Sequence, residues 1–343
     1  MNPESTPLAP STQSPPSHHA PTGGFRNPWP GSTPTGFSGL FRWAIERSRQ
    51  TRPAVPAPPQ LHTPAVVRPR GEASDLRVTA IGHSTFLLQI GGLNILTDPV
   101  FGEGASPLPF AGPRRHHEPG LALEALPPID IVLQSHDHYD HLDDAAVRHI
   151  AQAHPAATWC APLGVAARLR ERGVREIVER DWWGSAHVGA AAVTCVPAAH
   201  FSGRTPFDRD RTLWCGWAVT IGDRRIYFVG DTGFHPLFPE IGARLGPIDM
   251  VFMPVGAYEP RWFMKPVHLD PDEALEAFAG LTRPHDTHAT IMVAMHWGTF
   301  TLTDEPMDEP PRRTQIGWAH RGWAADRLWI LNPGETRAVR SVR

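Results

Sequence analysis

Apolar residues recur along the middle of the chain in short runs that have the length and composition of β-strands. The first three runs are Leu76 to Ile81, Phe86 to Ile90 and Leu93 to Leu96. The last two are joined by Gly91-Gly92, a dipeptide that favours a tight hairpin turn. The pattern predicts that the folded body begins near Leu76 with an antiparallel hairpin.

Helix-like segments follow and alternate with further short strands. Asp143 to His154 and Leu163 to Arg172 have the helical pattern. The strand-like runs around and after them are Thr158 to Ala161, Glu176 to Val178, Ala190 to Val196, Arg225 to Val229 and Thr290 to Met295. Strands that alternate with helices are typical of an α/β fold.

The first seventy residues have a different character. Residues 1–24 are rich in Pro, Ser and Thr, which predicts a disordered tail that would include His18 and His19. Residues 37–49 have apolar positions at helical spacing with Trp43 at the edge, and predict an amphipathic helix that either caps the domain or lies in a membrane interface. We therefore expect a tail (1–24), a helix followed by a Pro-rich linker (25–70) and one main domain (71–343).

The composition indicates where the protein is located and which partners are not expected. The net charge of −3 gives no basic field, so nucleic acid is not an expected partner. The three cysteines, Cys160, Cys195 and Cys215, lie in apolar runs without C-x-x-C spacing, as reduced core residues of a cytosolic protein do. No apolar run reaches the roughly 20 residues of a membrane span, and no signal peptide is visible, so we expect a cytoplasmic protein.

The densest candidate chemistry lies in an H-x-H-x-D-H cluster between a strand-like run and a helix. The cluster contains His136, His138, Asp140 and His141. Side chains two apart in an extended segment point the same way, so His136 and His138 can hold one metal ion. Asp140 and His141 follow a turn and can face a second metal close by. A solvated polar loop is the alternative, but four ligand-type residues within six positions favour a metal site.

Three later strands each deliver one His or Asp at the carboxyl end. These residues are His200, Asp231 in Gly-Asp-Thr-Gly, and His296 in His-Trp-Gly. Open α/β sheets place their ligands at this edge. Two earlier residues, His83 and Asp98, are expected to orient metal-bound imidazoles from behind, although an Asp before Pro is also an ordinary turn residue.

The H-x-H-x-D-H cluster followed by these three residues resembles the metallo-β-lactamase superfamily. The resemblance implies an αββα sandwich, two mixed sheets face to face with helices outside. It also implies two metal sites: His136, His138 and His200 at the first, Asp140, His141 and His296 at the second, with Asp231 bridging them. Nitrogen and oxygen ligands suit two Zn²⁺ per chain, with Fe or Mn left open. A bridging Asp favours the phosphodiesterase and lactonase branches over the antibiotic-hydrolysing one.

Further motifs resemble the family of N-acylphosphatidylethanolamine-hydrolysing phospholipases D. They are Asn27-Pro28-Trp29-Pro30, Asp181-Trp182-Trp183, the segment from Gly256 to Lys265, His268-Leu269-Asp270-Pro271, His296 to Phe300 and Gly334 to Arg337. The resemblance covers the chain from Asn27 to Arg337. Val267 stands where the animal enzymes carry Gln, so the headgroup preference is left open.

This resemblance implies hydrolysis of a phospholipid at a membrane surface, releasing phosphatidic acid and an N-acylethanolamine. Asp140, Asp231 and His268 are then the candidate catalytic residues, with His268 polarising the phosphate or supplying a proton, unless it is a packing histidine. Arg261 and Lys265 would meet lipid phosphate or serve as structural ion-pair partners. A peripheral membrane location and a homodimer are left open.

Other functions compete with this one. A metal-dependent lactonase or small phosphodiester hydrolase of the same fold would favour a small polar pocket and would not need the helix at residues 37–49. A nuclease of this fold would carry a basic appendage, which the sequence lacks. A non-enzymatic metal scaffold would not need a complete open ligand set for two metals.

Overall fold

The computed structural model describes residues 17–49, 57, 59–107, 112–285 and 289–339, arranged as two seven-stranded sheets. The first sheet has the spatial order β14 (Thr336–Val339), β1 (Leu76–Gly82), β2 (Thr85–Ile90), β3 (Leu93–Thr97), β4 (Ile131–Leu133), β5 (Thr158–Pro162) and β6 (Ile177–Arg180). The second has the order β13 (Leu328–Trp329), β12 (Ile291–Met295), β11 (Met250–Pro254), β10 (Arg224–Phe228), β9 (Gly216–Ile221), β8 (Ala191–Val196) and β7 (Ser185–Val188). Each sheet mixes antiparallel and parallel pairs.

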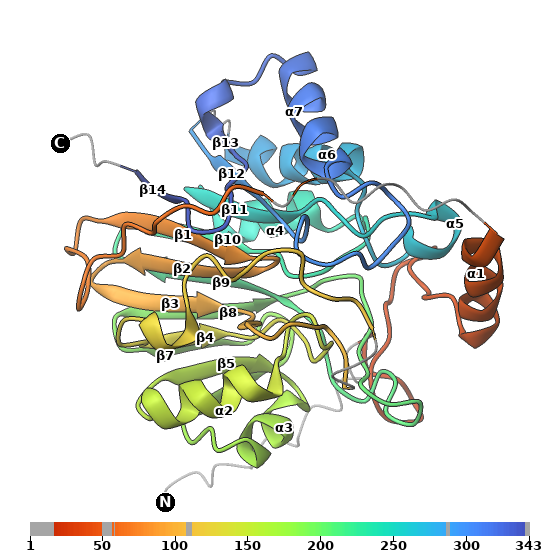
Figure 1. The fold of residues 1–343 in the computed structure, drawn as a ribbon, viewed down its shortest axis with the longest axis horizontal. Coiled ribbons are helices and arrows are strands. Elements are labelled where there is room, and N and C mark those ends of the chain that lie inside the picture. The colour runs from red at the N-terminus through yellow and green to blue at the C-terminus, as the bar shows by residue number, and fades with distance from the viewer. Residues whose placement is uncertain (1–16, 50–56, 58, 108–111, 286–288, 340–343) are drawn as a thin grey trace, which may run out of the picture.

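Helices lie outside the two sheets and at one end of them (Figure 1). The α-helices are α1 (Phe37–Arg49), α2 (Asp144–Ala153), α3 (Val165–Glu171), α4 (Phe238–Leu245), α5 (Arg261–Met264), α6 (Pro271–Thr282) and α7 (Glu309–His320). Short 3₁₀ turns occur at Leu123–Ala125, Arg283–His285 and Ala325–Arg327. Helices α2 and α3 accompany the first sheet, α4, α6 and α7 the second, and α1 lies beside α5. This is the αββα sandwich that the superfamily resemblance implied.

Strand β2 shows how the sequence pattern builds these layers. All six of its residues are buried, so it reads as an apolar run rather than as an alternating strand. Phe86 and Leu88 belong to the large core that fills the space between the sheets, whereas Leu87 packs in a second core with Val147 and Leu169 of the outer helices. Because successive side chains point to opposite faces, one strand serves both cores.

The predicted hairpin between β2 and β3 is confirmed. Ile90 pairs with Leu93, and the two residues between them, Gly91 and Gly92, have φ angles of 60° and 77°. A two-residue turn with both φ angles positive matches the twist of the flanking strands, and glycine adopts that conformation without steric cost.

The prediction of a disordered tail is wrong for residues 17–24. His19 forms a β-bridge with Phe25, and His18 is buried with its Nε2 2.6 Å from Asp181 Oδ1. The expectation that these histidines belong to tail composition failed because their partner lies more than 160 positions away. Residues 1–16, the rest of the predicted tail, lie outside the described residues.

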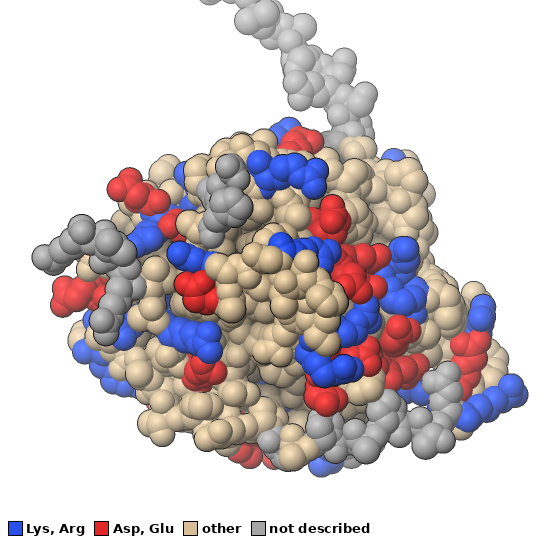
Figure 2. All heavy atoms as spheres, turned by 90° about the horizontal axis from the view of Figure 1, so that it is seen from above, with Lys and Arg blue, Asp and Glu red and all other residues tan. Residues whose placement is uncertain are grey.

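The surface of the described part carries mixed charge. On the face in Figure 2, Lys and Arg side chains are interspersed with Asp and Glu. None of the described helices combines the length and the apolar character that crossing a bilayer requires.

Candidate metal centre

The seven predicted ligands meet at one edge of the sandwich because each follows the end of a strand. His136 and His138 come after β4, and the chain then turns, with the His138 carbonyl accepting from the N–H groups of His141 (3.1 Å) and Leu142 (2.8 Å). This turn brings Asp140 and His141 to the cluster. Strands β8, β10 and β12 of the other sheet deliver His200, Asp231 and His296, so both sheets contribute.

Three histidines form the first group of ligand atoms. The distance from His136 Nε2 to His138 Nδ1 is 2.8 Å, and that from His200 Nε2 to His138 Nδ1 is 3.2 Å. All three nitrogens lie within 4.8 Å of one another and can bind a single ion. The structure therefore brings together the three residues that the superfamily resemblance assigned to one metal.

The second group surrounds the two carboxylates. Asp140 Oδ2 lies 3.5 Å from His141 Nε2 and 3.4 Å from His296 Nε2. Asp231 Oδ2 lies 3.1 and 3.0 Å from the same two nitrogens and 3.7 Å from His200 Nε2, which belongs to the first group. Asp231 therefore occupies the bridging position between the two groups.

Several of these atoms are buried without a hydrogen bond, which tests whether metals fit. His141 Nε2, His296 Nε2 and Asp231 Oδ1 have no hydrogen-bond partner although all three side chains are buried. Leaving buried polar atoms unpaired costs about 1–3 kcal/mol each, and metal coordination would remove that cost. Two metal ions with nitrogen and oxygen ligands fit this set, and Zn²⁺ suits the donor types.

The pKa values divide the histidines in the same way. Burial lowers the pKa of His138 to about 4 and that of His200 to about 3, so both are in the neutral form that binds metal. Burial also disfavours the charged form of His296, but Asp231 and Asp140 outweigh it and raise its pKa to about 9. The two carboxylates thus stabilise positive charge at the second group. A divalent metal ion would supply that charge in place of protons on the histidines.

Asp98 lies next to the cluster and contacts one of the predicted ligands, His141. Its Oδ2 accepts from His141 Nδ1 at 2.7 Å and from Ser135 Oγ at 2.5 Å, and its Oδ1 accepts from the Ser135 N–H at 2.7 Å. A hydrogen bond to the far nitrogen fixes the ring and leaves His141 Nε2 aimed at the metal position.

His83 lies closer to the metal position than expected. Its Nε2 is 3.1 Å from Asp140 Oδ2, and it groups with Asp140, His141 and His296 as a possible ligand set. Burial lowers the pKa of His83 to about 3, so the ring is neutral and donates an N–H to the carboxylate. His83, Asp98 and His296 all have φ angles in the left-handed region (55°, 27° and 62°), a strained conformation that concentrates at functional sites.

His268 also joins the cluster. Its Nδ1 lies 4.0 Å from Asp231 Oδ2 and has no hydrogen-bond partner, and its ring centroid is 5.0 Å from that of His200. Burial lowers the pKa of His268 well below 6.5, so the ring is neutral and has one N–H to offer.

Arg261 and Lys265 both pair with Glu273, which is one of the two roles that the sequence left open for them. Arg261 Nη2 lies 2.5 Å from Glu273 Oε2, and its Nη1 donates to the His268 carbonyl at 3.0 Å. Lys265 is exposed, with Nζ 3.7 Å from Glu273 Oε1. Arg261 therefore fixes the loop that carries His268.

Asn27 has a role that the sequence did not predict. Its Nδ2 donates to the His200 carbonyl at 2.8 Å, while its Oδ1 accepts from the His200 N–H at 3.2 Å and from Trp214 Nε1 at 3.1 Å. The Asn-Pro-Trp-Pro motif marked this residue, but its partner lies 173 positions away along the chain. The Asn27 side chain therefore hydrogen-bonds to both backbone groups of His200, a predicted metal ligand.

A cavity of about 330 Å³ opens onto the cluster. Its polar end includes His138, Asp140, Asp231 and His268. Its walls are mainly apolar and include Leu40, Trp43, Phe201, Phe263, Met264, Val267 and Leu302. An apolar cleft that ends in a few converging polar groups is typical of a small-molecule or lipid site.

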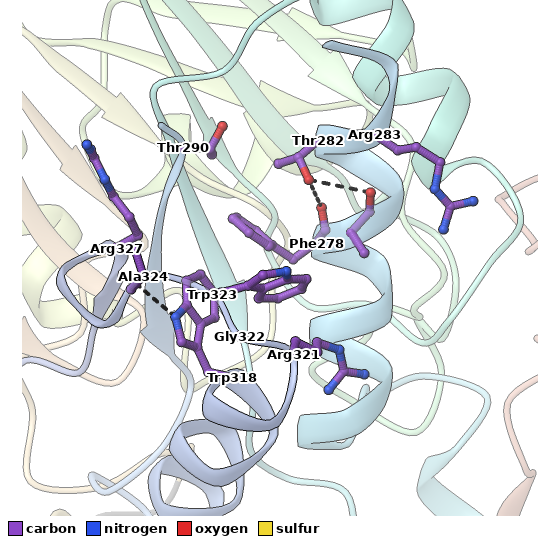
Figure 3. Close-up of a pocket in the computed structure, with 11 residues that line it drawn as sticks. Phe278, Thr282, Arg283, Thr290, Trp318, Arg321, Gly322, Trp323, Ala324 and Arg327 are labelled. Carbon is purple, nitrogen blue, oxygen red and sulfur yellow. Dashed lines mark hydrogen bonds between the residues drawn. The ribbon is translucent and has the colours of Figure 1, made fainter. Parts of the chain in front are cut away.

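Another cavity, of about 570 Å³, lies between α6 and the segment after α7 (Figure 3). Aromatic rings from Phe278, Trp318 and Trp323 lie along it, with Arg321 and Arg327. It contains none of the predicted site residues and adjoins the start of β12, whereas His296 follows the end of that strand. The metal cluster therefore identifies the smaller cavity as the candidate active site.

Comparisons with known proteins agree with this geometry. Residues 93–297 match the model of the beta-lactamase superfamily domain. An uncharacterised protein of Mycobacterium tuberculosis is 45% identical over 278 residues, which cover 80% of this chain and 72% of that protein. The N-acyl-phosphatidylethanolamine-hydrolyzing phospholipase D 1 of Caenorhabditis elegans is 41% identical over 248 residues, 69% of this chain and 68% of that enzyme.

Solved structures share the fold. The isothiocyanate hydrolase from Delia radicum gut bacteria superposes with a TM-score of 0.60 at 22% identity, covering 77% of this chain and 99% of that one. The sandwich, the ligand set at its edge and the matching domain model lead to one conclusion. The chain belongs to the metallo-β-lactamase superfamily and has the fold of its metal-dependent hydrolases, with candidate His and Asp metal ligands gathered at one edge of the sandwich.

Proposed function

We propose that the protein is a phospholipase D-type phosphodiesterase that hydrolyses N-acylphosphatidylethanolamine at a membrane surface. The observation that carries the proposal is the apolar cavity, which connects helix α1 to the metal ligands. A long acyl chain needs such a wall, whereas a small polar lactone does not. The relationship to the phospholipase D of Caenorhabditis elegans supports the same substrate class.

Helix α1 links the cavity to the outside. Leu40 and Trp43 line the cavity, while Leu40, Phe41 and Ile45 are 47%, 70% and 36% exposed. Three exposed apolar side chains on one short helix beside the cavity form a surface that a bilayer would cover. Burial in lipid would contribute about 1 kcal/mol or more of binding free energy per side chain. The same helix would dock on the lipid and guide an acyl chain inward.

Trp43 packs against the body of the protein. Its ring stacks on Phe263 at 5.4 Å, and its Nε1 donates to Asp304 Oδ2 at 2.6 Å. Arg47 also pairs with Asp304, at 3.1 Å. These contacts fix α1 to the body of the protein, so the helix holds its exposed side chains in a set position.

The residues around the cluster suit phosphodiester hydrolysis. Two bound divalent ions would supply Lewis acidity for a phosphoryl oxygen and an ionised water at neutral pH. Asp231 and Asp140 supply negative charge among the ligand nitrogens and would hold the ions at the strand ends. His268 faces the cavity as a neutral imidazole, and its N–H can donate to a phosphoryl oxygen or to the leaving oxygen.

A substrate comparison tests the proposal. The zinc-loaded protein is assayed on vesicles that contain N-acylphosphatidylethanolamine, on water-soluble phosphodiesters and on lactones. We expect release of phosphatidic acid and N-acylethanolamine, with the phospholipid the best substrate by kcat/KM. Faster turnover of a lactone or of a small diester would instead assign the protein to the soluble hydrolases of this superfamily.

A further inference from the structure

A second cluster of metal-ligand side chains lies outside the centre described above. It joins the N-terminal strap, which we define as residues 17–32, to the loop between β6 and β7. His18 Nε2 is 2.6 Å from Asp181 Oδ1, and His19 Nε2 is 2.8 Å from Asp181 Oδ2. All three ligand atoms lie within 4.8 Å of one another. The spacing is close to that of the three histidines of the main centre, 2.8 and 3.2 Å.

The cluster is held in place by its surroundings. The Trp182 N–H donates to Asp181 Oδ1 at 2.7 Å, which orients the carboxylate. The ring of His18 stacks on Trp182 with centroids 4.1 Å apart, and Trp29 stacks on the same indole at 5.5 Å. Such contacts with outer residues are what keep metal ligands in register.

The protonation states suit a metal ion. Burial lowers the pKa of His18 below 6.5 in spite of the nearby carboxylate, so the imidazole is neutral at neutral pH. Burial disfavours the charged form of Asp181, but the hydrogen bonds from His18 and His19 outweigh it and lower its pKa below 3.8. The side chains of His19 and Asp181 are 31% and 30% exposed, which leaves room for a water molecule as fourth ligand.

We propose that His18, His19 and Asp181 bind a further Zn²⁺ ion, which fastens the N-terminal strap to the β6–β7 loop. Two imidazoles and a carboxylate with an open fourth position are a common Zn²⁺ ligand set. The ion would stabilise the strap, because unfolding of the strap separates its ligands.

The site has a consequence for the main metal centre. Asn27 lies on the same strap and brackets the backbone of His200, a predicted metal ligand. A zinc ion at His18, His19 and Asp181 therefore anchors the element that positions His200. The proposal does not depend on which bond the main centre hydrolyses.

Metal content tests the proposal directly. The full-length chain is stripped with a chelator, dialysed against buffered micromolar free zinc and analysed for zinc per chain. We expect the parent to hold one more Zn²⁺ than His18→Ala/His19→Ala. The matched control is His187→Ala/His320→Ala, which removes two exposed histidines outside both clusters and should keep the parent's zinc content. Equal zinc content in the parent and in the His18/His19 variant would overturn the proposal.

A more conservative substitution controls for misfolding of the strap. Asp181→Asn keeps an oxygen that accepts from the Trp182 N–H but removes the anionic ligand, and it should also lose one Zn²⁺. Zinc should protect the parent from tryptic cleavage at the exposed Arg26 of the strap, and should protect Asp181→Asn less. The proposal would be contradicted if Asp181→Asn kept its zinc content and if zinc did not change the cleavage of either protein. Hydrogen bonds alone would then hold the strap on the β6–β7 loop.

Discussion

Asp231 is the residue at which the two halves of the main metal centre meet. Its Oδ2 lies within 3.7 Å of ligand nitrogens from both groups, and its side chain is almost completely buried. Removing its charge takes away the carboxylate that faces ligand nitrogens of both groups and would offset the charge of the metal ions in a buried site. The effect on metal binding should therefore exceed that of any outer residue.

We expect Asp231→Asn to bind the second metal more weakly and to lose more than about 100-fold in rate, because changes to outer residues alone cost roughly 10–100-fold. Metal analysis after desalting and a hydrolysis assay measure both effects. Asp223→Asn, at an exposed carboxylate, is the control. Full metal retention in Asp231→Asn would contradict the bridging role.

His268 lies beside the cluster without belonging to either group of metal ligands assigned here. If its N–H acts on the phosphate or the leaving group, His268→Ala should lower kcat by about 10²–10⁴ and leave the metal content unchanged. Near-normal turnover would identify a packing histidine. Loss of metal together with rate would identify a metal ligand, which its 4.0 Å distance from Asp231 Oδ2 makes a real alternative.

At the scale of elements, α1 is the part of the fold on which the proposed membrane substrate depends. It is fastened through Trp43 and Arg47 and exposes Phe41 and Ile45. The sequence left open whether this helix caps the domain or meets a membrane. The structure gives it one attached face and one exposed apolar face, and the second face can be changed without touching the first.

We expect Phe41→Asp/Ile45→Asp to lose much more activity on vesicles than on a soluble phosphodiester, because neither residue lines the cavity. Vesicle co-sedimentation should fall in parallel. Ile316→Asp is the control, because Ile316 is an apolar residue on α7 whose exposure of 46% lies between those of Ile45 and Phe41. An equal loss on both substrates, or unchanged vesicle binding, would make α1 a structural cap only.

At the scale of the whole molecule, the metal centre joins the two sheets. His136, His138, Asp140 and His141 follow a strand of the first sheet, whereas the other ligands follow strands of the second. A ligand that binds only the folded state at about 100 times its Kd adds about 2.7 kcal/mol to the free energy of unfolding. Metal removal should therefore destabilise the sandwich as a unit.

Chelation is expected to lower Tm by about 5–10 °C, and zinc should restore it. Differential scanning calorimetry of the stripped and reloaded protein measures the shift. Asp231→Asn, which retains less metal, should show a smaller shift than the parent. An unchanged Tm after complete metal removal would mean that the two sheets are held together by their apolar core alone.

Local patterns were enough to predict the strands of the first hairpin, helix α2 and the ligand-bearing strand ends. Hairpin geometry and helix periodicity depend on neighbouring residues, so β2, β3 and α2 were predicted to within one or two positions. Strand β11 (Met250–Pro254) was missed, because a short, completely buried run has no period that separates strand from helix. Its place in the sheet is decided by its neighbours β10 and β12.

The sequence by itself determined the ligand types, their order and their position after strand ends, because spacing along an extended chain sets which side chains face one way. Only the tertiary structure decided that Asn27 hydrogen-bonds to the backbone of His200, that Asp181 contacts two histidines of the strap, and that Arg261 hydrogen-bonds to the loop that carries His268. Contacts such as those of Asn27 and Asp181 join positions more than 160 residues apart, and which distant segments meet depends on how two sheets bury their faces against each other.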